Sequence, residues 1–461
     1  APQFARKHIL RAARRQFKAG DVQHWWHPAS GAGVRTRISD DLLWLPYVVN
    51  HYVRVTGDFD ILEEQLPFLN GRKLQEDEHE IYLVPEVSSE RASLYEHCRR
   101  AIELGATSGP HGLPLIGTGD WNDGLNRVGV EGKGESVWLA WFLIDILDGF
   151  ADLAEETGRQ DDAADFRKRA SRLAEHVEKE AWDGAWYQRA TYDDGTPLGS
   201  ARNVEARIDS LPQSWALICG AADPDRSKTA LESVWEQLVR EKDRLVLLFT
   251  PPFDKSAHNP GYIAGYPPGV RENGGQYTHA AVWLAIAYAR MGDGKRAAQI
   301  LRMLNPIEHT REPQDVDRYT VEPYVIAADV YNLTGKVGKG GWTWYTGSAG
   351  WMYRAWVEEI LGLKVRGDVL RVDPVIPAAW DDFNIRYSHR DAVYELKVEN
   401  PDHVGRGVAW IEMDGRRLDK LELPLDGNAV KHKVVVRMGV REDTKSKKQE
   451  DSAEPVESGD D

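Results

Sequence analysis

The sequence has little cysteine, no long apolar run and no excess of positive charge, and each shortage excludes a class of protein. Its 461 residues include two cysteines, Cys98 and Cys219, whose separation fits neither a disulfide framework nor a metal-ligand spacing. No stretch approaches the roughly 18 apolar residues of a membrane-spanning helix. The segment 1–17 has a basic amphipathic pattern without the apolar centre of a signal peptide. We therefore expect a reducing compartment and a cytoplasmic location.

Aromatic residues are abundant instead. The net charge of −15 argues against a nucleic-acid partner, whereas 17 Trp and 17 Tyr are unusual. Many of them stand beside Asp, Asn, Gln, His or Gly, as in HWWHP, GDWND, QSWAL and GGWTWYTGSAGW. Sugar C–H faces stack on aromatic rings while sugar hydroxyls bind planar polar groups, so the pattern favours a carbohydrate ligand, although a large core also needs aromatic residues.

A helical period dominates the chain up to about residue 365. Apolar residues recur at three- and four-residue spacing, and several segments end at a glycine that can stop a helix. Helices without intervening strands are typical of an α-solenoid or a closed toroid of helix pairs, and the lack of an internal repeat weakens the solenoid. The predicted helices span residues 40–58, 93–105, 135–158, 162–182, 211–220, 225–240, 277–293, 294–306, 322–332 and 348–363.

After Leu363 apolar and polar residues alternate, with turn signals between the segments. This pattern predicts a small β-sandwich of antiparallel strands at residues 369–377, 383–400, 407–418 and 432–439. The stretch 441–461 has no apolar pattern and is predicted to be a disordered tail. The first helix begins abruptly, and a closed toroid needs earlier helices, so we expect the chain to be a fragment.

Four loops contain residues that suit chemistry. The first, GVRTRISDDLLW, sets Arg35 and Arg37 before Asp40 and Asp41. Ser39 as an N-cap, followed by acids in a first helical turn, explains part of this motif. The arginines fit that explanation less well, because they could pair with the acids or bind an anion through two hydrogen bonds. Both interpretations stay open.

The second loop, TGDWNDGLNRVG, holds Asp120, Trp121 and Asp123. Asp side chains stabilise turns around glycines, and that alone accounts for the motif. A carboxyl beside an indole and away from water has a raised pKa, however, and can act as a general acid near neutral pH. Asp123 and Trp121 are two residues apart, so an irregular loop can turn both side chains into one cavity.

The remaining two loops have features of an anion site. In GVRENGGQYTHAAVW, glycines flank Glu272 and Asn273, and His279 falls in the first turn of an apolar helix, where N–H groups favour an anion. In GGWTWYTGSAGW, Thr346 and Gly347 lead into a helix whose backbone N–H groups suit phosphate. A structural histidine and an ordinary Gly-rich helix start explain each loop alone. Together with the arginines they describe a phosphate pocket.

Several motifs resemble the glycoside hydrolase family 94 phosphorylases, which include cellobiose and chitobiose phosphorylases. They are GDWNDGLNRVG, RENGGQYTHAAVW, EPYVIAADVY and WTWYTGSAGWMYRAWVEEILGL. A further motif, GDVQHWWHPASGAGVRTRISDDLLWLPYVV, resembles the C-terminal phosphorylase-like region of bacterial cyclic β-1,2-glucan synthases. The resemblance, from about residue 5 to about residue 440, implies a mainly α fold. It comprises an (α/α)6 barrel without its first helices over 1–364, a small antiparallel β-domain over 365–440 and a disordered acidic tail over 441–461.

The resemblance also implies inverting phosphorolysis, in which one carboxylic acid protonates the glycosidic oxygen while phosphate attacks the anomeric carbon. Asp123 matches the acid and Trp121 a sugar-site aromatic. Arg35 and Asp41 match a sugar-binding pair. The residues that match phosphate contacts, followed by one further candidate, are His279, Thr346, Gly347 and Arg37. The other substrate contacts that we predict are Asp120, Glu272 and Gln213, Asp120 being alternatively a positioning residue.

One departure from the family concerns the helix after the PYV motif, where some members have Gln and this chain has Ala327 and Ala328. The departure bears on whether phosphate or water is the acceptor. The alternatives are therefore an inverting hydrolase on the same barrel, with Glu272, Glu322 or Asp120 as base, and a catalytically silent glucan-binding fragment.

The predicted function is phosphorolysis of β-linked gluco-oligosaccharides, in particular β-1,2-linked ones, to α-glucose 1-phosphate. The chain would be the phosphorylase domain of a cyclic β-1,2-glucan synthase, where trimming of the linear glucan sets ring size. We expect a β-glucan oligosaccharide and inorganic phosphate as partners, no cofactor, no metal and no membrane span in this chain, with a homodimer left open. The parent synthase would be membrane-bound and would hold this region on the cytoplasmic side of an inner membrane.

Overall fold

The computed structural model describes residues 2–441, which divide into two compact units. The first unit comprises residues 1–287 and 300–352, and the second comprises residues 288–299 and the chain from Tyr353 onward. The predicted division after residue 364 stays a prediction, and the predicted tail lies outside the described residues except for Arg441.

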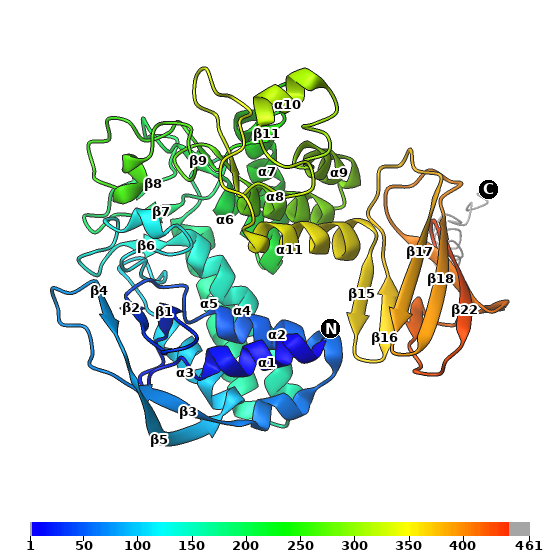
Figure 1. Cartoon of the computed structure of the whole chain (residues 1–461), viewed down its shortest axis with the longest axis horizontal. Helices are drawn as coiled ribbons and strands as arrows, with labels where there is room; N and C mark the ends of the chain where they lie inside the picture. Colours follow the sequence, from blue (N-terminus) through cyan, green and yellow to red (C-terminus); the bar gives the residue numbers. More distant parts are fainter. Residues whose placement is uncertain (1, 442–461) are drawn as a thin grey trace, which may run out of the picture. The chain divides into compact units, whose positions relative to one another are not determined.

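Helices dominate the first unit (Figure 1). The first group of helices consists of α1 (Pro2–Ala13), α2 (Trp44–Thr56), α3 (Leu94–Gly105), α4 (Val137–Glu156), α5 (Gln160–Glu180) and α6 (Ser210–Cys219). The second group consists of α7 (Pro224–Leu238), α8 (Thr278–Met291), α9 (Gly294–Met303), α10 (Pro313–Tyr319) and α11 (Thr346–Arg354). Three short 3-10 helices, η1 (Phe59–Glu63), η2 (Asp123–Leu125) and η3 (Tyr262–Gly265), complete the set. The π-helix η4 (Ala355–Ile360) and parts of α8 and α9 belong to the second unit.

Side-chain caps explain where several of these helices begin. Ser93 accepts a hydrogen bond from the Glu96 backbone N–H at the start of α3, and Ser136 accepts one from the Leu139 backbone N–H at the start of α4. Each bond satisfies a backbone donor that has no partner within the helix. Ser39 is no such cap, because α2 begins only at Trp44 and the Ser39 hydroxyl donates to the Gly119 carbonyl instead.

The core of the first unit is built on three indole rings from three helices. Trp138 of α4, Trp215 of α6 and Trp283 of α8 are fully buried, and their ring centroids lie 5.1, 6.1 and 6.3 Å apart. Helix α4 also packs against α2, α5 and α6 and buries residues on every side. Large aromatic side chains bury the most apolar area per residue, so this contact holds the three helices together.

The strands of the first unit are short and form several small antiparallel sheets. The sheets of three strands are β1 (Gln23–Trp26), β2 (Gly33–Thr36) and β4 (Glu80–Leu83), and β6 (Glu135–Ser136), β7 (Ala190–Thr191) and β8 (Pro197–Leu198). The paired strands are β3 (Gln65–Asn70) with β5 (Glu86–Ser93), β9 (Ile208–Asp209) with β12 (Phe249–Thr250), β10 (Val239–Arg240) with β11 (Leu245–Val246), and β13 (Gln276–Tyr277) with β14 (Asp329–Val330).

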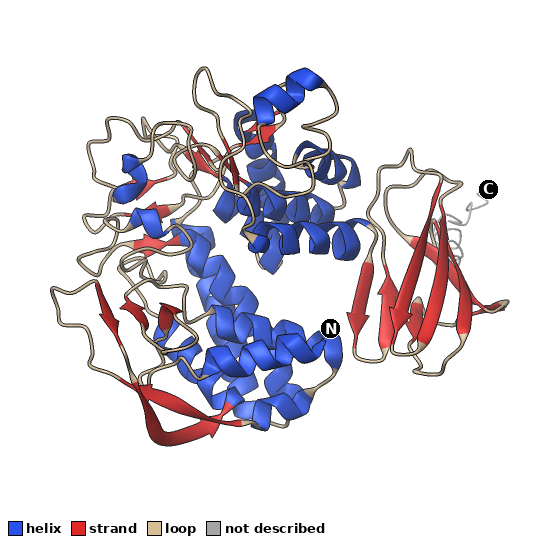
Figure 2. Cartoon of the chain, viewed as in Figure 1, coloured by secondary structure: helices blue, strands red, loops and turns tan. Residues whose placement is uncertain are grey.

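Three of these strands lead directly into the core helices. β6, β9 and β13 immediately precede α4, α6 and α8, so the short sheets and loops gather at the N-terminal ends of these helices. Figure 2 shows this segregation, with strands and loops on one side of the helices of the first unit. The helix N-termini and the loops that contain Asp123 and His279 therefore share one end of the unit.

The second unit contains two sheets. β15 (Leu363–Arg366), β16 (Val369–Val372) and β21 (Glu422–Pro424) form the smaller one. The larger one has the order β17 (Asp382–His389), β18 (Ala392–Glu399), β22 (Lys431–Met438), β19 (Val408–Met413) and β20 (Arg416–Arg417). The strands alternate buried and exposed residues as predicted, but β18 and β22 run parallel. The prediction of antiparallel strands fails there because β19 to β21 form the crossover between them.

The helix-rich region followed by a β-region is confirmed, and the closed (α/α)6 arrangement stays a prediction. The helix predicted at 322–332 is wrong, because that segment forms turns and then β14, which pairs with β13. The helical pattern also gave no indication of β1 to β5. None of the helices within residues 2–441 combines the length and apolar character needed to cross a bilayer.

Replacement of Phe142 by alanine tests the aromatic core. Phe142 is fully buried in α4 and contacts the rings of Trp138 and Trp215. We expect F142A to lower the free energy of unfolding by about 3–5 kcal/mol, measured by urea unfolding followed by circular dichroism. Phe4, with 67% exposure, is the matched control, and F4A should change stability by less than about 0.5 kcal/mol. Equal effects of the two substitutions would contradict this description of the core.

Candidate active site

The loop that holds the predicted acid is anchored by a buried ion pair. Asp120 is fully buried, and its two carboxylate oxygens accept hydrogen bonds from the Arg189 guanidinium at 2.5 and 2.7 Å. The Ser136 hydroxyl and the Asn122 backbone N–H donate to the same carboxylate at 2.6 and 3.1 Å. Protein groups thus occupy both oxygens of Asp120, so the structure places this predicted sugar contact inside the protein, where it holds the loop.

Asp123 follows at the start of η2 and is accessible. Its side chain is 44% exposed, so a ligand can reach the carboxyl. Partial withdrawal from water raises the pKa of Asp123 to about 6, and the charges of Asp41, Glu272 and Asp120 act in the same direction, whereas His24 opposes them. Gly119 has φ of 126°, and a Cβ there would lie 3.2 Å from the Asp123 Cα, so the turn needs glycine. A carboxyl with this pKa is partly protonated near neutral pH and can serve as a general acid.

A histidine connects Asp41 with Asp123. The His24 Nδ1 atom lies 2.8 Å from Oδ1 of Asp41, and the His24 Nε2 atom lies 3.7 Å from Oδ2 of Asp123. The hydrogen bond to Asp41 raises the pKa of His24 to about 9. The Thr36 hydroxyl donates to the other oxygen of Asp41 at 3.0 Å. The structure therefore brings Asp41 and Asp123 together through an imidazolium.

Trp121 and His279 form the aromatic side of the site. The Trp121 ring lies 5.4 Å from the ring of His279 and 5.3 Å from that of Trp283, which belongs to the helix core. Burial lowers the pKa of His279 to about 3, so this imidazole is neutral. Its Nε2 atom is buried and has no hydrogen-bond partner among the described residues. A neutral imidazole with a nitrogen to spare can donate to or accept from a polar ligand.

Glu272 lies in the same loop as His279 but in a different environment. Its side chain is 19% exposed, and burial raises its pKa. The Arg271 Nε atom lies 3.5 Å from Oε2 of Glu272, and the Arg271 guanidinium also covers the rings of Tyr266 and Trp342 at 5.0 and 5.4 Å. The field of Glu272 reaches Asp123, so the two carboxyls belong to one region.

Thr346 and Gly347, the predicted phosphate contacts, are exposed at the start of α11. This helix also carries Trp351, whose ring lies 6.0 Å from that of His279. The structure thus connects the two predicted parts of the phosphate pocket through one aromatic contact. Before Thr346 the chain exposes a series of aromatic side chains, Tyr324, Trp342, Trp344 and Tyr345.

The two arginines of the first loop face a different hollow. Arg35 pairs with Asp21 through Nε and Nη2 at 2.5 and 2.8 Å, and Arg37 donates to the backbone carbonyls of Gln75 and Glu78. Strand alternation explains this placement, because Thr36, between the two arginines, points to Asp41. Arg35 and Arg37 line a hollow of about 460 Å³ whose lining includes neither Asp123 nor His279. The structure does not bring Arg35 to Asp41.

Gln213 and Asp40 lie in the interior. The Gln213 amide exchanges hydrogen bonds with the backbone N–H and carbonyl of Tyr187 and donates to the Asp209 carbonyl, so it ties α6 to the chain before β7. Asp40 accepts a hydrogen bond from the Trp44 indole at 2.9 Å. Burial, followed by the charge of Asp41, raises the pKa of Asp40 well above its ordinary value.

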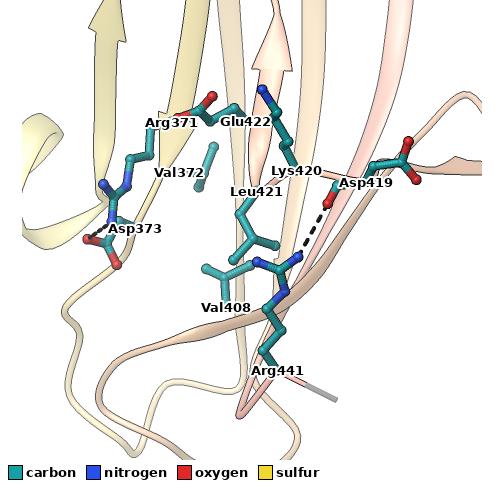
Figure 3. Close-up of a pocket in the computed structure, with 9 residues that line it drawn as sticks. All are labelled: Arg371, Val372, Asp373, Val408, Asp419, Lys420, Leu421, Glu422 and Arg441. Atoms are coloured by element: carbon teal, nitrogen blue, oxygen red, sulfur yellow. Dashed lines mark hydrogen bonds and ion pairs between the residues drawn. The ribbon is translucent and has the colours of Figure 1, made fainter. Parts of the chain in front are cut away.

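The second unit has a hollow of its own, of about 420 Å³ (Figure 3). Charged side chains of both signs line it, and Arg371 pairs with Asp373 at 3.5 Å while Arg441 donates to the Asp419 carbonyl at 3.3 Å. No aromatic ring lines this hollow, in contrast to the region around Asp123. We therefore assign the candidate active site to the first unit.

Comparison with known proteins identifies the family of the chain. The glycosyl hydrolase 94 superfamily catalytic domain matches residues 1–362. The chain belongs to this family.

Two curated relatives are similar over most of the chain. The cyclic β-(1,2)-glucan synthase NdvB of Rhizobium meliloti strain 1021 is 48% identical over 411 residues, which are 89% of this chain and 14% of that protein. Solabiose phosphorylase of Paenibacillus borealis is 30% identical over 440 residues, 95% of this chain and 54% of that enzyme. The chain thus spans about a seventh of NdvB and about half of solabiose phosphorylase.

A solved structure shares the fold alone. A sialidase matches with a TM-score of 0.50 at 14% identity, over 76% of this chain and 29% of that one.

Two residues of this candidate site were not predicted from the sequence. His24 is the first residue of the HWWHP cluster, and this cluster predicted only aromatic rings for a sugar ligand. Arg189 has no local motif and meets Asp120 across 69 positions of the chain. The polar residue inside HWWHP could have indicated His24, but no signal in the sequence indicates Arg189.

Replacement of Arg189 by methionine tests the anchor of the acid loop. The substitution leaves the Asp120 carboxylate buried without its cation, so we expect R189M to lower the free energy of unfolding by about 3–5 kcal/mol. Arg54 pairs with Asp152 at 2.6 Å on the surface, and R54M should cost less than about 1 kcal/mol. Chemical unfolding of both variants gives the comparison, and a mild effect of R189M would contradict the assigned anchoring role.

Proposed function

We propose that the chain catalyses inverting phosphorolysis of β-1,2-linked gluco-oligosaccharides as the phosphorylase domain of a cyclic β-1,2-glucan synthase. One observation carries the proposal: Asp123 is an accessible carboxyl with a pKa of about 6, and the Trp121 ring of the same loop lies 5.4 Å from the ring of a neutral His279. The linkage rests on the relative NdvB, which is named for cyclic β-(1,2)-glucan synthesis. An (α/α)6 barrel is the frame in which we place these residues.

The proposed reaction is a single displacement. Protonated Asp123 donates its proton to the glycosidic oxygen, and the bond between that oxygen and the anomeric carbon breaks. A phosphate oxygen forms the new bond to the anomeric carbon from the opposite face, which inverts the β configuration and gives α-glucose 1-phosphate. The glucan leaves one residue shorter, and Asp123 regains a proton from hydrogen phosphate or solvent. Phosphate is itself a nucleophile, so one carboxyl suffices where inverting hydrolysis needs two.

His279, Thr346 and Gly347 are the phosphate contacts in this proposal. The unpartnered Nε2 of His279 and the exposed start of α11, linked through Trp351, support this assignment. The N–H groups at a helix start favour an anion, and a neutral imidazole accommodates a phosphate that carries a proton. Arg37 remains a candidate on the family resemblance alone.

Trp121 and Asp41 are the sugar contacts that the geometry supports. Asp41 lies beside the acid through His24, whereas Arg35 would have to leave Asp21 to join it. The Trp342 ring contacts the Arg271 guanidinium, and the rings of Trp342 and Trp344 are exposed. Because exposed rings stack on the faces of sugar residues, this segment suits an oligosaccharide longer than a disaccharide.

The inverting hydrolase finds less support. It needs a second free carboxylate as base, and Asp120 is occupied by Arg189 while Glu322 accepts a hydrogen bond from the Trp344 indole at 3.2 Å. Glu272 is the candidate base that remains, and its Oε2 atom lies 3.5 Å from the Arg271 Nε atom.

Activity should fall as the pH rises through the pKa of the acid. Asp123 works in its protonated form, and its pKa is raised to about 6, so the reactive form predominates below pH 6 and is lost above it. We expect kcat/KM for phosphorolysis to decline above pH 6 by roughly tenfold per pH unit. The protein in its full natural length, given β-1,2-gluco-oligosaccharides and phosphate, provides the profile. A rate that stays constant up to about pH 8 would argue against Asp123 as the acid.

The D123N substitution removes the proton donor and keeps the shape of the side chain. We expect phosphorolysis to slow by roughly 10²–10⁴-fold, measured as glucose 1-phosphate release. Asp60, which is exposed in η1, is the control, and D60N should retain activity.

The same assay separates phosphorolysis from hydrolysis. With ¹⁸O-labelled phosphate, phosphorolysis transfers one labelled oxygen to the anomeric carbon. Free glucose that carries oxygen from water, formed equally without phosphate, would instead establish the hydrolase.

A further inference from the structure

His24 occupies an irregular position in its strand. β1 pairs with β2 at Gln23↔Arg35 and at Trp25↔Val34, so two steps along β1 face one step along β2 and His24 is the additional residue. A bulge of this kind turns a side chain away from the regular alternation, and bulges are common next to active sites. The bulge directs His24 out of the sheet pattern, toward the turn before α2 and toward η2.

The two ring nitrogens of His24 face two different carboxyl groups. Nδ1 lies 2.8 and 3.0 Å from the two oxygens of Asp41, which fixes the ring plane, and Nε2 lies 3.7 Å from Oδ2 of Asp123. The His24 side chain is 26% exposed and that of Asp41 15%, so both are largely shielded from water. Because Thr36 holds the second oxygen of Asp41, the carboxylate cannot turn away from the imidazole.

We propose, on the basis of the function proposed above, that His24 is a positioning residue for the acid Asp123: fixed by Asp41, it directs an N–H and a positive charge at the Asp123 carboxyl. When Asp123 transfers its proton to the glycosidic oxygen, it becomes a carboxylate. A cation at 3.7 Å stabilises that carboxylate and so eases proton donation. His24 touches neither sugar nor phosphate in this role and acts only through the acid.

The surrounding charges show why such a cation matters. The charged groups that face His24 are Asp41 and Asp40, from the turn before α2, and Asp123 from η2. The charges of three carboxyl groups, those of Asp41, Glu272 and Asp120, raise the pKa of Asp123, and the charge of His24 lowers it. Without the imidazolium, the carboxyl charges would act unopposed and the pKa of Asp123 would rise further above 6.

The test compares two substitutions at His24 with one just after the end of β1. Asn in place of His24 keeps an N–H donor near the position of Nδ1 and so preserves the bond to Asp41, but it carries no charge. Gln reaches toward Asp123, also without charge. His27, which is exposed three residues later, is the control for H27Q.

We expect H24N and H24Q to lower kcat by roughly tenfold or more and to move the alkaline limb of the kcat/KM profile upward by roughly one pH unit. H24N should leave KM near the wild-type value, because Asp41 stays in place, and H27Q should change none of these quantities. A loss of folding would reduce the active fraction without moving the limb. An unmoved alkaline limb in both His24 variants would overturn the proposal.

A second measurement does not depend on activity. In the wild-type protein with ¹³C-labelled histidine, the NMR titration of His24 should have its midpoint near 9, and D123N should lower that midpoint. A midpoint near the ordinary value of 6.5 would overturn the role of His24. If His24 titrates as expected but the wild-type protein forms no glucose 1-phosphate from β-1,2-glucan, the proposed reaction fails while the charge arrangement holds.

Discussion

The buried ion pair between Asp120 and Arg189 is the interaction on which the site depends. A carboxylate and a guanidinium removed from water are tolerable only when each satisfies the other, and here Ser136 and the Asn122 backbone complete the set. Ser136 also caps α4, so the pair connects the acid loop, the first turn of a core helix and the chain that enters β7. Asp123 is three residues from this anchor, which explains how an irregular loop keeps the Asp123 carboxyl in place.

Around that anchor the site combines acidic groups with aromatic rings rather than with many cations. Asp40, Asp41, Asp123 and Glu272 all lie in the region. Burial and mutual repulsion raise the pKa values of Asp40, Asp123 and Glu272, so these groups hold protons more readily than surface carboxyls. Burial acts on His279 in the opposite direction and keeps the imidazole neutral. Burial in the same region therefore leaves Asp123 able to donate a proton and His279 uncharged.

The sequence predicted the helices of the first unit well, because an apolar face repeats along each of them and needs no distant partner to be recognised. It also placed Trp121 and His279 among the candidate sugar and phosphate contacts, and the structure brings their rings to 5.4 Å. Arg35, Asp120 and Gln213 are buried among partners far away in the chain, and a local pattern cannot reveal such partners. The failed helix at 322–332 has the same cause, since its pairing partner β13 lies about fifty residues earlier. His24 was missed for a different reason: the sequence pattern did not indicate strand β1, so it could not show that a bulge there turns His24 out of the sheet pattern.

The bulge in β1 makes this strand sensitive to its own length. Ordinary substitutions at Trp25 or Trp26 would leave the number of residues in the strand unchanged. A deletion of one residue between Gln23 and Trp25 would restore regular pairing with β2 and remove the additional position that turns a side chain out of the sheet pattern. Among descendants of this sequence, the segment from Gln23 to Trp26 should therefore vary in composition far more readily than in residue count.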